Sequence, residues 1–327
     1  MSLSTSATST DRIVNAVYIY GGLFIAITGF IGHSFNLCVF LSLRTFRELS
    51  CSLYLILMSI ANVGEILLIV LPRVAVSLIG TDGTDLSIIW CKSRAFLSHY
   101  SQILAMTSFC LVTIDQYCAT SHYQILQKFC KIRIAQSLII FFALIWFIHG
   151  FPYAIYFIHT INTTNGKITC MVTDPIYLQY RMYAILIILV GYAPLIITTI
   201  FGFMAFYNVQ KSSSYAVPLV RRELDKQLTQ MILVQALIDI LILLPNTIIN
   251  LFVLNINWFS SSYIQAQIRF TNNITYAMYY IHACVSCFLL NFDIFFNIIM
   301  IIFYIEFILY LFLCFGTIPS TSFLCFE

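Results

Sequence analysis

The sequence has very little charge. Only 9% of its 327 residues are Asp, Glu, Lys or Arg, while 61% are hydrophobic. A soluble domain carries about 25% charged residues, so a soluble core could not hide this much apolar surface. Lipid must be the solvent for most of the chain, and we expect an integral membrane protein.

Several classes of function lack the residues that they need. No run of Lys and Arg occurs, and a net charge of +3 is too small to indicate a nucleic-acid partner. The eleven cysteines show no metal-ligand spacing, and the C-x-x-C of Cys284 and Cys287 lies in an apolar stretch where thiols pack as small hydrophobes. No nucleophilic triad, carboxylate pair or phosphate-binding loop is found, so we expect neither an enzyme nor a cofactor.

Seven apolar stretches are long enough to cross a membrane, which takes about 20 residues. Helices are the default there because they satisfy their own backbone hydrogen bonds, and the strand alternation of a barrel is absent. We predict an all-α fold, a seven-transmembrane helical bundle in residues 17–297, between a tail at 1–16 and an atypical hydrophobic segment at 298–327. The expected spans are 17–43, 52–78, 91–117, 134–158, 181–207, 229–255 and 273–297.

The N-terminus is expected outside the cell. Residues 1–16 lack a signal-peptide pattern, so the first span would direct insertion. Nine Lys and Arg residues fall in the expected inner loops and seven in the outer segments, a weak bias of the correct sign. Glycosylation sequons at Asn162 and Asn273 lie on the same outer side. We expect a multi-pass glycoprotein of the plasma membrane.

Two cysteines are expected in the oxidising compartment. Cys91 opens span three at its outer end, and Cys170 lies in the loop between spans four and five. A disulfide is the natural interpretation, and two free thiols are the alternative. The bridge would tie the outer loop to the top of span three.

The triplet Asp115-Gln116-Tyr117 follows Cys91 by about 24–26 residues, or about 36–39 Å of helix, which reaches the inner face. In order and spacing, residues 17 to about 290 resemble rhodopsin-like (class A) G-protein-coupled receptors. The segment 221–230 also resembles invertebrate peptide receptors, especially the FMRFamide-receptor-like group. The residues that carry the resemblance are Asn36, Asn62, Cys91, Asp115, Gln116, Tyr117, Trp146, Cys170, Pro194 and Pro245.

The resemblance implies a receptor that passes an extracellular signal to a heterotrimeric G protein. In the family, the Arg of the triplet contacts an acidic residue entering span six, where this chain has Asp225. Gln116 replaces that Arg and leaves only a hydrogen bond, about half as strong as a charge-assisted one. We therefore expect a weaker resting lock and altered G-protein engagement. The family closes span seven with the motif Asn-Pro-x-x-Tyr. The most similar segment here begins at Asn291 and lacks both the Pro and the Tyr.

Further departures affect the middle of the bundle. Asn62 and Ala105 replace the carboxylate and hydroxyl of the family's sodium site, so we expect no sodium dependence. Leu243 replaces an aromatic switch residue, while Pro245 should still kink span six. Asp239 and Glu65 are intramembrane carboxylates, which are either functional or satisfied by neighbouring polar groups.

The ligand class is narrowed mainly by exclusion. No Lys follows Lys226, so no Schiff base for retinal is available in span seven. Ser98 stands where amine receptors carry Asp. The outer half mixes aromatic and charged groups, which suits a neuropeptide, although any single Tyr can be a membrane-interface residue. The candidate ligand-pocket residues are Glu65, Ser98, His99 and Tyr279.

Three functions compete. The leading hypothesis is a receptor whose inner face, with Asp115–Tyr117 and the loop 211–226, opens to a G protein when a peptide binds. A receptor-derived binding protein or decoy without signalling is the alternative, favoured by Gln116, Leu243 and the aberrant end of the chain. A small transporter or channel with Glu65, Asp115 and Asp239 along an ion path is the third, but no inverted repeat is visible.

The end of the chain departs most from the family. Residues 298–314 are apolar on all faces, with Glu306 as their one charged residue, and contain no Lys or Arg, so they do not form an interfacial basic helix. They could extend span seven, form an eighth span, or reflect a wrongly assigned gene end. We favour the last, because the resemblance stops near Leu290.

Overall fold

A computed structural model describes residues 12–161, 166, 168–211, 219–256, 259 and 261–288, with side chains described for all of these except Thr45, 219–226 and 285–288. By internal contacts the chain divides into two units, Met1–Cys287 and Phe288–Glu327. The helices and strands below belong to the first unit, apart from the final residue of α13. Of the predicted sites, Asn162, Asn291 and the side chain of Asp225 lie outside the described residues.

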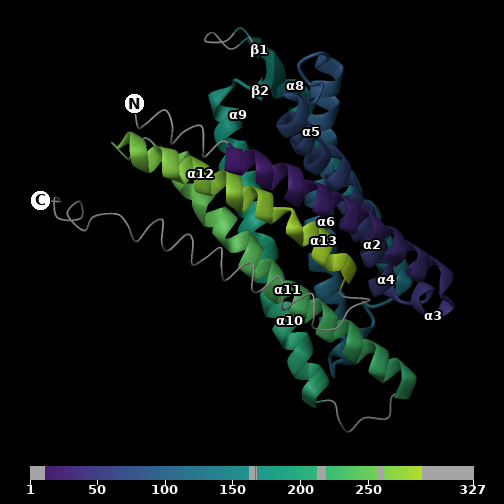
Figure 1. Ribbon diagram of the computed structural model, residues 1–327. Helices are drawn as coiled ribbons and strands as arrows, with labels where there is room; N and C mark the ends of the chain where they lie inside the picture. Colours follow the sequence, from purple (N-terminus) through teal and green to yellow (C-terminus); the bar gives the residue numbers. More distant parts are fainter. Residues whose placement is uncertain are drawn as a thin grey trace, which may run out of the picture. The chain divides into compact units, whose positions relative to one another are not determined.

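The described residues are almost entirely helical (Figure 1). Three of the long helices contain π-helical segments, labelled η1 to η3, which run into the α-helix that follows. The elements are η1 (Val17–Gly21), α2 (Gly22–Ser42), α3 (Arg44–Arg47), α4 (Ser50–Glu65), η2 (Ile66–Val70), α5 (Leu71–Ile79), α6 (Ile88–Thr120), α7 (Gln124–Gln127), α8 (Ile132–Tyr156), β1 (Phe157–Ile161), β2 (Ile168–Val172), α9 (Pro175–Tyr180), η3 (Arg181–Tyr192), α10 (Ala193–Lys211), α11 (Leu219–Leu254), α12 (Ser262–Tyr279) and α13 (Ile281–Phe288).

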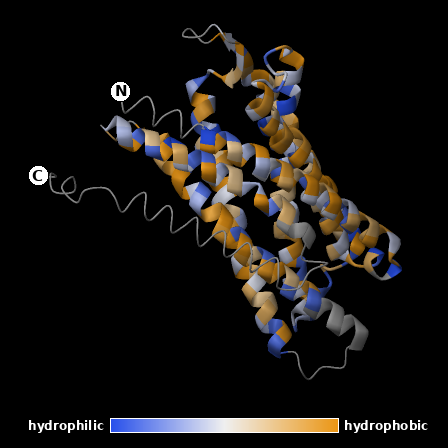
Figure 2. Cartoon of the chain, in the orientation of Figure 1, coloured by the Kyte–Doolittle hydropathy of each residue, from blue (hydrophilic) through white to orange (hydrophobic). Residues whose placement is uncertain are grey.

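Within the described part of the chain, six helices are long and apolar enough to cross a membrane. They are Arg12–Ser42, Ser50–Ile79, Ile88–Thr120, Ile132–Tyr156, Pro175–Lys211 and Gln227–Leu254. Figure 2 shows hydrophobic residues along most of their length, with hydrophilic residues gathered near the helix ends. On α8, Phe141, Leu144 and Ile148 are all more than half exposed and share one face by their spacing. An uncovered apolar stripe of this kind is stable in lipid.

Helix α6 is the central element and packs against α4, α8 and α10. Two glycines on its neighbours explain the close approach. A Cβ at Gly64 of α4 would lie 2.5 Å from the Ser101 hydroxyl, and one at Gly150 of α8 would lie 2.7 Å from the Phe96 ring. Small residues let membrane helices approach in this way. The centre of α6 is buried, with Ile103 and Ala105 only 1% and 3% exposed.

Two helices begin earlier than their apolar stretches. Helix α11 begins at Leu219 rather than near residue 229, and α12 begins at Ser262 rather than near 273. Residues 262–272, which the predicted spans leave outside the helices, are therefore helical. Hydropathy marks only the lipid-embedded part of a helix, whereas the backbone hydrogen bonds continue into water. Polar side chains support the extension, because Gln267 donates a hydrogen bond to the Tyr263 hydroxyl at 2.9 Å.

A β-hairpin that the sequence did not predict lies between α8 and α9. Strands β1 and β2 pair antiparallel, with Phe157 opposite Val172 and His159 opposite Cys170. The Thr160 and Thr169 hydroxyls meet across the strands at 3.2 Å. Cross-strand hydroxyl pairs add stability to such a short ladder.

Candidate functional site

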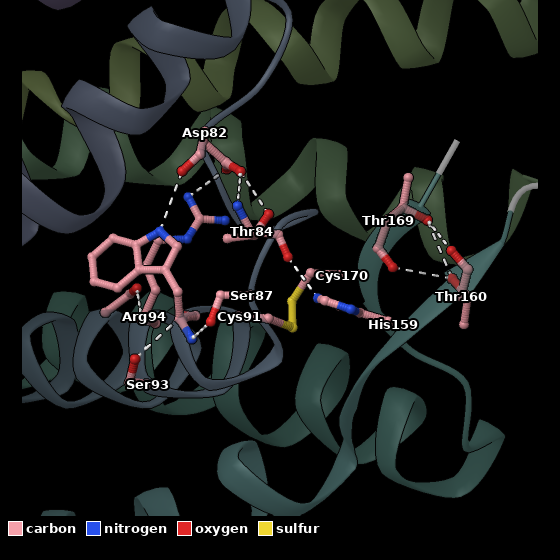
Figure 3. Close-up of a disulfide and its surroundings, with 12 residues drawn as sticks. Asp82, Thr84, Ser87, Cys91, Ser93, Arg94, His159, Thr160, Thr169 and Cys170 are labelled. Carbon is pink, nitrogen blue, oxygen red and sulfur yellow. Dashed lines mark hydrogen bonds and ion pairs between the residues drawn. A yellow bond between two sulfur atoms is a disulfide. The ribbon is translucent and has the colours of Figure 1, made fainter. Parts of the chain in front are cut away.

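The hairpin is attached to the rest of the protein at two points, one on helix α6 and one on the α5–α6 loop. Cys170 of β2 forms a disulfide with Cys91 of α6, with a Cα–Cα distance of 5.8 Å, which confirms the predicted bridge (Figure 3). His159, opposite Cys170 on β1, donates a hydrogen bond through Nε2 to the Thr84 carbonyl oxygen at 2.7 Å. The hairpin is thus held against both α6 and the α5–α6 loop.

Asp82 organises the α5–α6 loop, as Figure 3 shows. Its carboxylate accepts hydrogen bonds from the Thr84 hydroxyl at 2.6 Å and the Thr84 amide at 3.1 Å, and pairs with Arg94 Nη1 at 2.7 Å. Trp90 Nε1 donates to the Asp82 carbonyl oxygen at 3.2 Å. Partial burial raises the pKa of Asp82, but the hydrogen bonds from Thr84 and the charge of Arg94 outweigh it, so this pKa lies below its ordinary value.

A cavity of about 960 Å³ is bordered by the loop and the two hairpin strands, which together we call the outer cover (residues 80–87, 157–161 and 168–172). Its walls come from η2, α5, α6, α8, the outer cover, α9, η3 and α12. The polar lining includes Arg73, Arg94, Ser98, His99, Gln102, Arg181 and Tyr276. Three guanidinium groups therefore share one cavity with imidazole, amide and phenol groups.

The four predicted pocket residues separate into two pairs. Ser98 and His99 line the cavity. Tyr279 does not line it, but its hydroxyl accepts a hydrogen bond from Gln102 at 3.0 Å, and Gln102 does line it. Glu65 has no exposed surface, is absent from the cavity lining, and lies 3.8 Å from His282 Nε2. Gln102 was not predicted as a pocket residue from the sequence, although it lies one helical turn from Ser98.

His99 belongs to a chain of polar contacts that crosses three elements. Its Nε2 lies 3.0 Å from His149 Nδ1 on α8, and His149 Nε2 lies 2.9 Å from the Tyr180 hydroxyl on α9. Its ring stacks on Tyr153, with centroids 4.3 Å apart. His149 and Tyr153 carried no sequence signal, because nothing in an apolar span marks which helix face meets a neighbour.

The opposite end of α6 carries the triplet. The Asp115 carboxylate accepts the Ser50 hydroxyl at 2.8 Å, which ties α6 to α4. Gln116 Oε1 accepts the Thr229 hydroxyl at 3.2 Å, which ties α6 to α11. Tyr117 contacts Phe201 of α10, with ring centroids 5.5 Å apart. The triplet thus joins α6 to three neighbouring helices.

The sequence model of the 7 transmembrane receptor (rhodopsin family) matches residues 35–289. This chain belongs to the rhodopsin family of receptors. The predicted family and helical bundle are confirmed, and the receptor is a multi-pass membrane protein. Members of the family are receptors rather than enzymes, which also favours a receptor over a transporter or channel. A comparison with curated proteins finds no significant match.

The receptor buries its mid-membrane polar residues. Asn36, Asn62 and Asp239 are each 2% exposed. Gln235, one turn earlier on α11, is the polar neighbour that interacts with Asp239. Ala105, at the position of the family's sodium-site hydroxyl, packs with Ala61 and Leu104 in a small apolar cluster that Trp146 covers.

Helix α11 continues through Pro245, and the buried Thr247 hydroxyl donates to the Leu243 carbonyl oxygen at 2.8 Å. Asn273, one of the two sequons, lies within α12, where its backbone carbonyl accepts the Tyr18 hydroxyl at 3.0 Å. Its glycosylation stays a prediction, as does that of Asn162.

Proposed function

We propose that this receptor binds an extracellular peptide in the outer cavity and signals to a heterotrimeric G protein. One observation carries the proposal: α6 lines the cavity with Ser98 and His99 and holds α11 through Gln116 at its other end. His99 and Gln116 are separated by about 17 residues, or about 26 Å of helix. A single rigid element therefore connects the candidate ligand site with the inner contact.

The disulfide supports the proposed orientation. Such bonds persist in oxidising compartments, so the end of α6 that carries Cys91 belongs outside the cell. Two membrane-spanning helices precede α6. Because two crossings return the chain to the side on which it started, the N-terminus lies on the same outer side as Cys91. This orientation suits a plasma-membrane receptor with an extracellular N-terminus.

The cavity supports a peptide ligand by its size and its lining. Small-molecule sites measure about 300–1,000 Å³, and this cavity, at about 960 Å³, lies at the upper end. Guanidinium, imidazole, amide and phenol groups are distributed around it rather than gathered at one point. A peptide, with several amides and a terminus to satisfy, uses such a distributed lining well.

The inner end supports a two-state switch. Gln116 and Thr229 join α6 to α11 by one neutral hydrogen bond. A ligand that favours the arrangement without this bond shifts the population toward it. We infer that Asp115, Gln116, Tyr117 and the segment 211–226 then form the surface that the G protein contacts, with Pro245 and Asn291 taking part in the same transition.

A decoy that binds ligand without signalling is the second candidate. Gln116 carries no charge where the family presents Arg to the G protein, and the buried Leu243 replaces the aromatic switch residue. Both changes leave the outer cavity unaffected. A decoy would therefore bind with full affinity and fail only at the inner face.

The experiment measures two outputs from the same cells. Cells that express the receptor with an N-terminal epitope tag are exposed to a peptide library, and surface binding and G-protein activation are recorded in parallel. Binding together with activation supports the proposal. Binding without activation supports the decoy, and a current or solute flux without either would contradict both.

A further inference from the structure

The three arginines that line the outer cavity are not equivalent. Arg94 is neutralised by Asp82 at 2.7 Å. Among the described side chains, no carboxylate forms an ion pair with Arg73 or Arg181. The other carboxylate in the cavity lining, that of Asp85, accepts a hydrogen bond from the Thr81 hydroxyl instead of pairing with an arginine. Two guanidinium charges in the cavity thus lack an anionic partner within the described chain.

Aromatic rings hold both of these guanidinium groups. Arg73 lies over the Tyr276 ring at 5.2 Å and the Tyr18 ring at 5.9 Å, and Arg181 lies over the Phe157 ring at 5.5 Å. A ring orients a guanidinium and stabilises its charge without neutralising it. The donors on the edge of the planar group remain suited to a bidentate acceptor. The rings therefore position two cationic forks toward a shared cavity.

Arg181 stands next to a second group with an unused polar atom. Arg181 and Tyr153 both line the cavity and interact electrostatically, and the Tyr153 ring stacks on His99 at 4.3 Å. His99 is 3% exposed and lines the cavity, and its Nδ1 has no hydrogen-bond partner among the described residues. A buried imidazole nitrogen without a partner costs free energy unless a ligand satisfies it.

The polar chain behind His99 can make that nitrogen a donor. If Tyr180 donates to His149 Nε2 and His149 Nδ1 donates to His99 Nε2, the proton of neutral His99 resides on Nδ1. An anion at Nδ1 selects this tautomer over the reverse one. Arg181 and His99 then present donors to the same acceptor, backed by Tyr153.

We propose that the outer cavity recognises a carboxylate group of the ligand, with Arg181 as its main partner and His99 Nδ1 as a second donor. Arg73, which also lines the cavity, adds positive potential that concentrates anions there. This inference rests on the proposed binding of an extracellular ligand in the cavity. An amidated cationic peptide of the FMRFamide type carries no such group, so the inference excludes the ligand class that the finer sequence resemblance suggests.

The probes separate the sources of the carboxylate. Each peptide of a synthetic library is made with a free C-terminal carboxylate and with a C-terminal amide, and its acidic side chains are replaced in parallel by Asn or Gln. Small mono- and dicarboxylic acids form a third arm. Surface binding to the full-length receptor is measured directly, with G-protein activation recorded beside it.

We expect one arm in which removal of the carboxylate weakens binding at least about 30-fold, as for loss of one partner of a buried charge pair. Equal binding of the acid and amide forms in every arm overturns the inference, as does a panel in which no acidic probe binds. Acid-selective binding without G-protein activation contradicts the signalling proposal alone. Activation by a peptide that is indifferent to its carboxylates contradicts the inference alone.

Variants then assign the partner. Arg181→Gln should reduce affinity for the acid form to that of the amide form, whereas Arg181→Glu should reverse the preference. Arg269→Gln is the matched control, because Arg269 is exposed on α12 and does not line the cavity. Equal effects of Arg181→Gln and Arg269→Gln overturn the role of Arg181. The acid–amide comparison on the natural chain decides the inference even if an Arg181 variant fails to reach the surface.

Discussion

Gln116 Oε1 accepts a hydrogen bond from the Thr229 hydroxyl at 3.2 Å, and both residues are buried. Neither side chain is charged, so this contact between α6 and α11 is a neutral hydrogen bond. A neutral hydrogen bond contributes about 0.5–1.5 kcal/mol, so the resting contact between α6 and α11 is weak. Small changes at this contact should alter the ligand-independent activity of the receptor.

The substitution Thr229→Val should raise ligand-independent signalling about 2- to 10-fold, because it removes the resting bond while keeping the side-chain volume. Thr113→Val is the matched control. The buried Thr113 hydroxyl donates only to the Phe109 carbonyl oxygen of its own helix, at 2.8 Å. Basal G-protein activation per surface receptor is the measurement, and equal output from the two variants contradicts the prediction.

The substitution Gln116→Arg restores the residue that the family carries. A guanidinium can pair with an acidic side chain on α11, where Asp225 lies one turn before Thr229. Charge-assisted bonds are about twice as strong as neutral ones, so we expect lower basal signalling and a larger response to ligand. Both are read in the same G-protein assay. If basal and ligand-stimulated signalling equal those of the natural chain, Gln116 does not control the resting state.

Ser50 and Ser52 offer a matched pair on α4. Ser50→Ala removes a donor from the buried Asp115 carboxylate and should lower the free energy of unfolding by about 1–3 kcal/mol. The Ser52 hydroxyl is equally buried but has no partner among the described residues, so Ser52→Ala should be neutral or slightly stabilising. Thermal denaturation of the detergent-solubilised receptor compares them. A loss at Ser52 as large as that at Ser50 is the contrary result.

The contact between Asp82 and Arg94 should stabilise the outer cover across the neutral range. Because the pKa of Asp82 is lowered in the fold, its contribution is complete above the ordinary carboxyl pKa and is lost only as pH falls through the lowered value. Asp82→Asn should therefore reduce thermal stability at pH 7, by about 1–3 kcal/mol for a partly buried pair.

The difference between the natural chain and Asp82→Asn should shrink only below about pH 4. Glu48→Gln serves as the control, since the Arg44–Glu48 pair is exposed and should contribute little at any pH. Melting curves over a pH series check both statements. A difference that already disappears between about pH 5 and 7 would contradict the lowered pKa.

Replacement of sodium by an organic cation should leave ligand affinity unchanged. Asn62 is a buried amide, and Ala105 packs in an apolar cluster, so the family's site offers neither a carboxylate nor a hydroxyl to the ion. Competition binding at constant ionic strength measures the effect. A clear sodium-dependent shift in affinity would show that another carboxylate, such as Glu65, has taken over the site.

Several features could be read from the sequence because they depend on length, order or compartment. Apolar stretches of sufficient length predicted the spans, and the scarcity of cysteines outside them predicted the Cys91–Cys170 bridge. The hairpin was missed, because its two five-residue strands become stable only when paired and tied down by the disulfide and His159. The starts of α11 and α12 were missed, because polar helical turns outside the lipid resemble loops in hydropathy.

The sequence by itself determined that this is a multi-pass membrane protein and which family it belongs to. Only the tertiary structure decided which polar residues meet. It placed Arg181 beside Tyr153 and His99, turned Glu65 away from the cavity, and joined Gln116 to Thr229. The physical reason is rotational. A soluble helix marks its buried face by a hydrophobic stripe, whereas a membrane helix is apolar on both its lipid and its protein faces, so its rotation is set by packing against its neighbours.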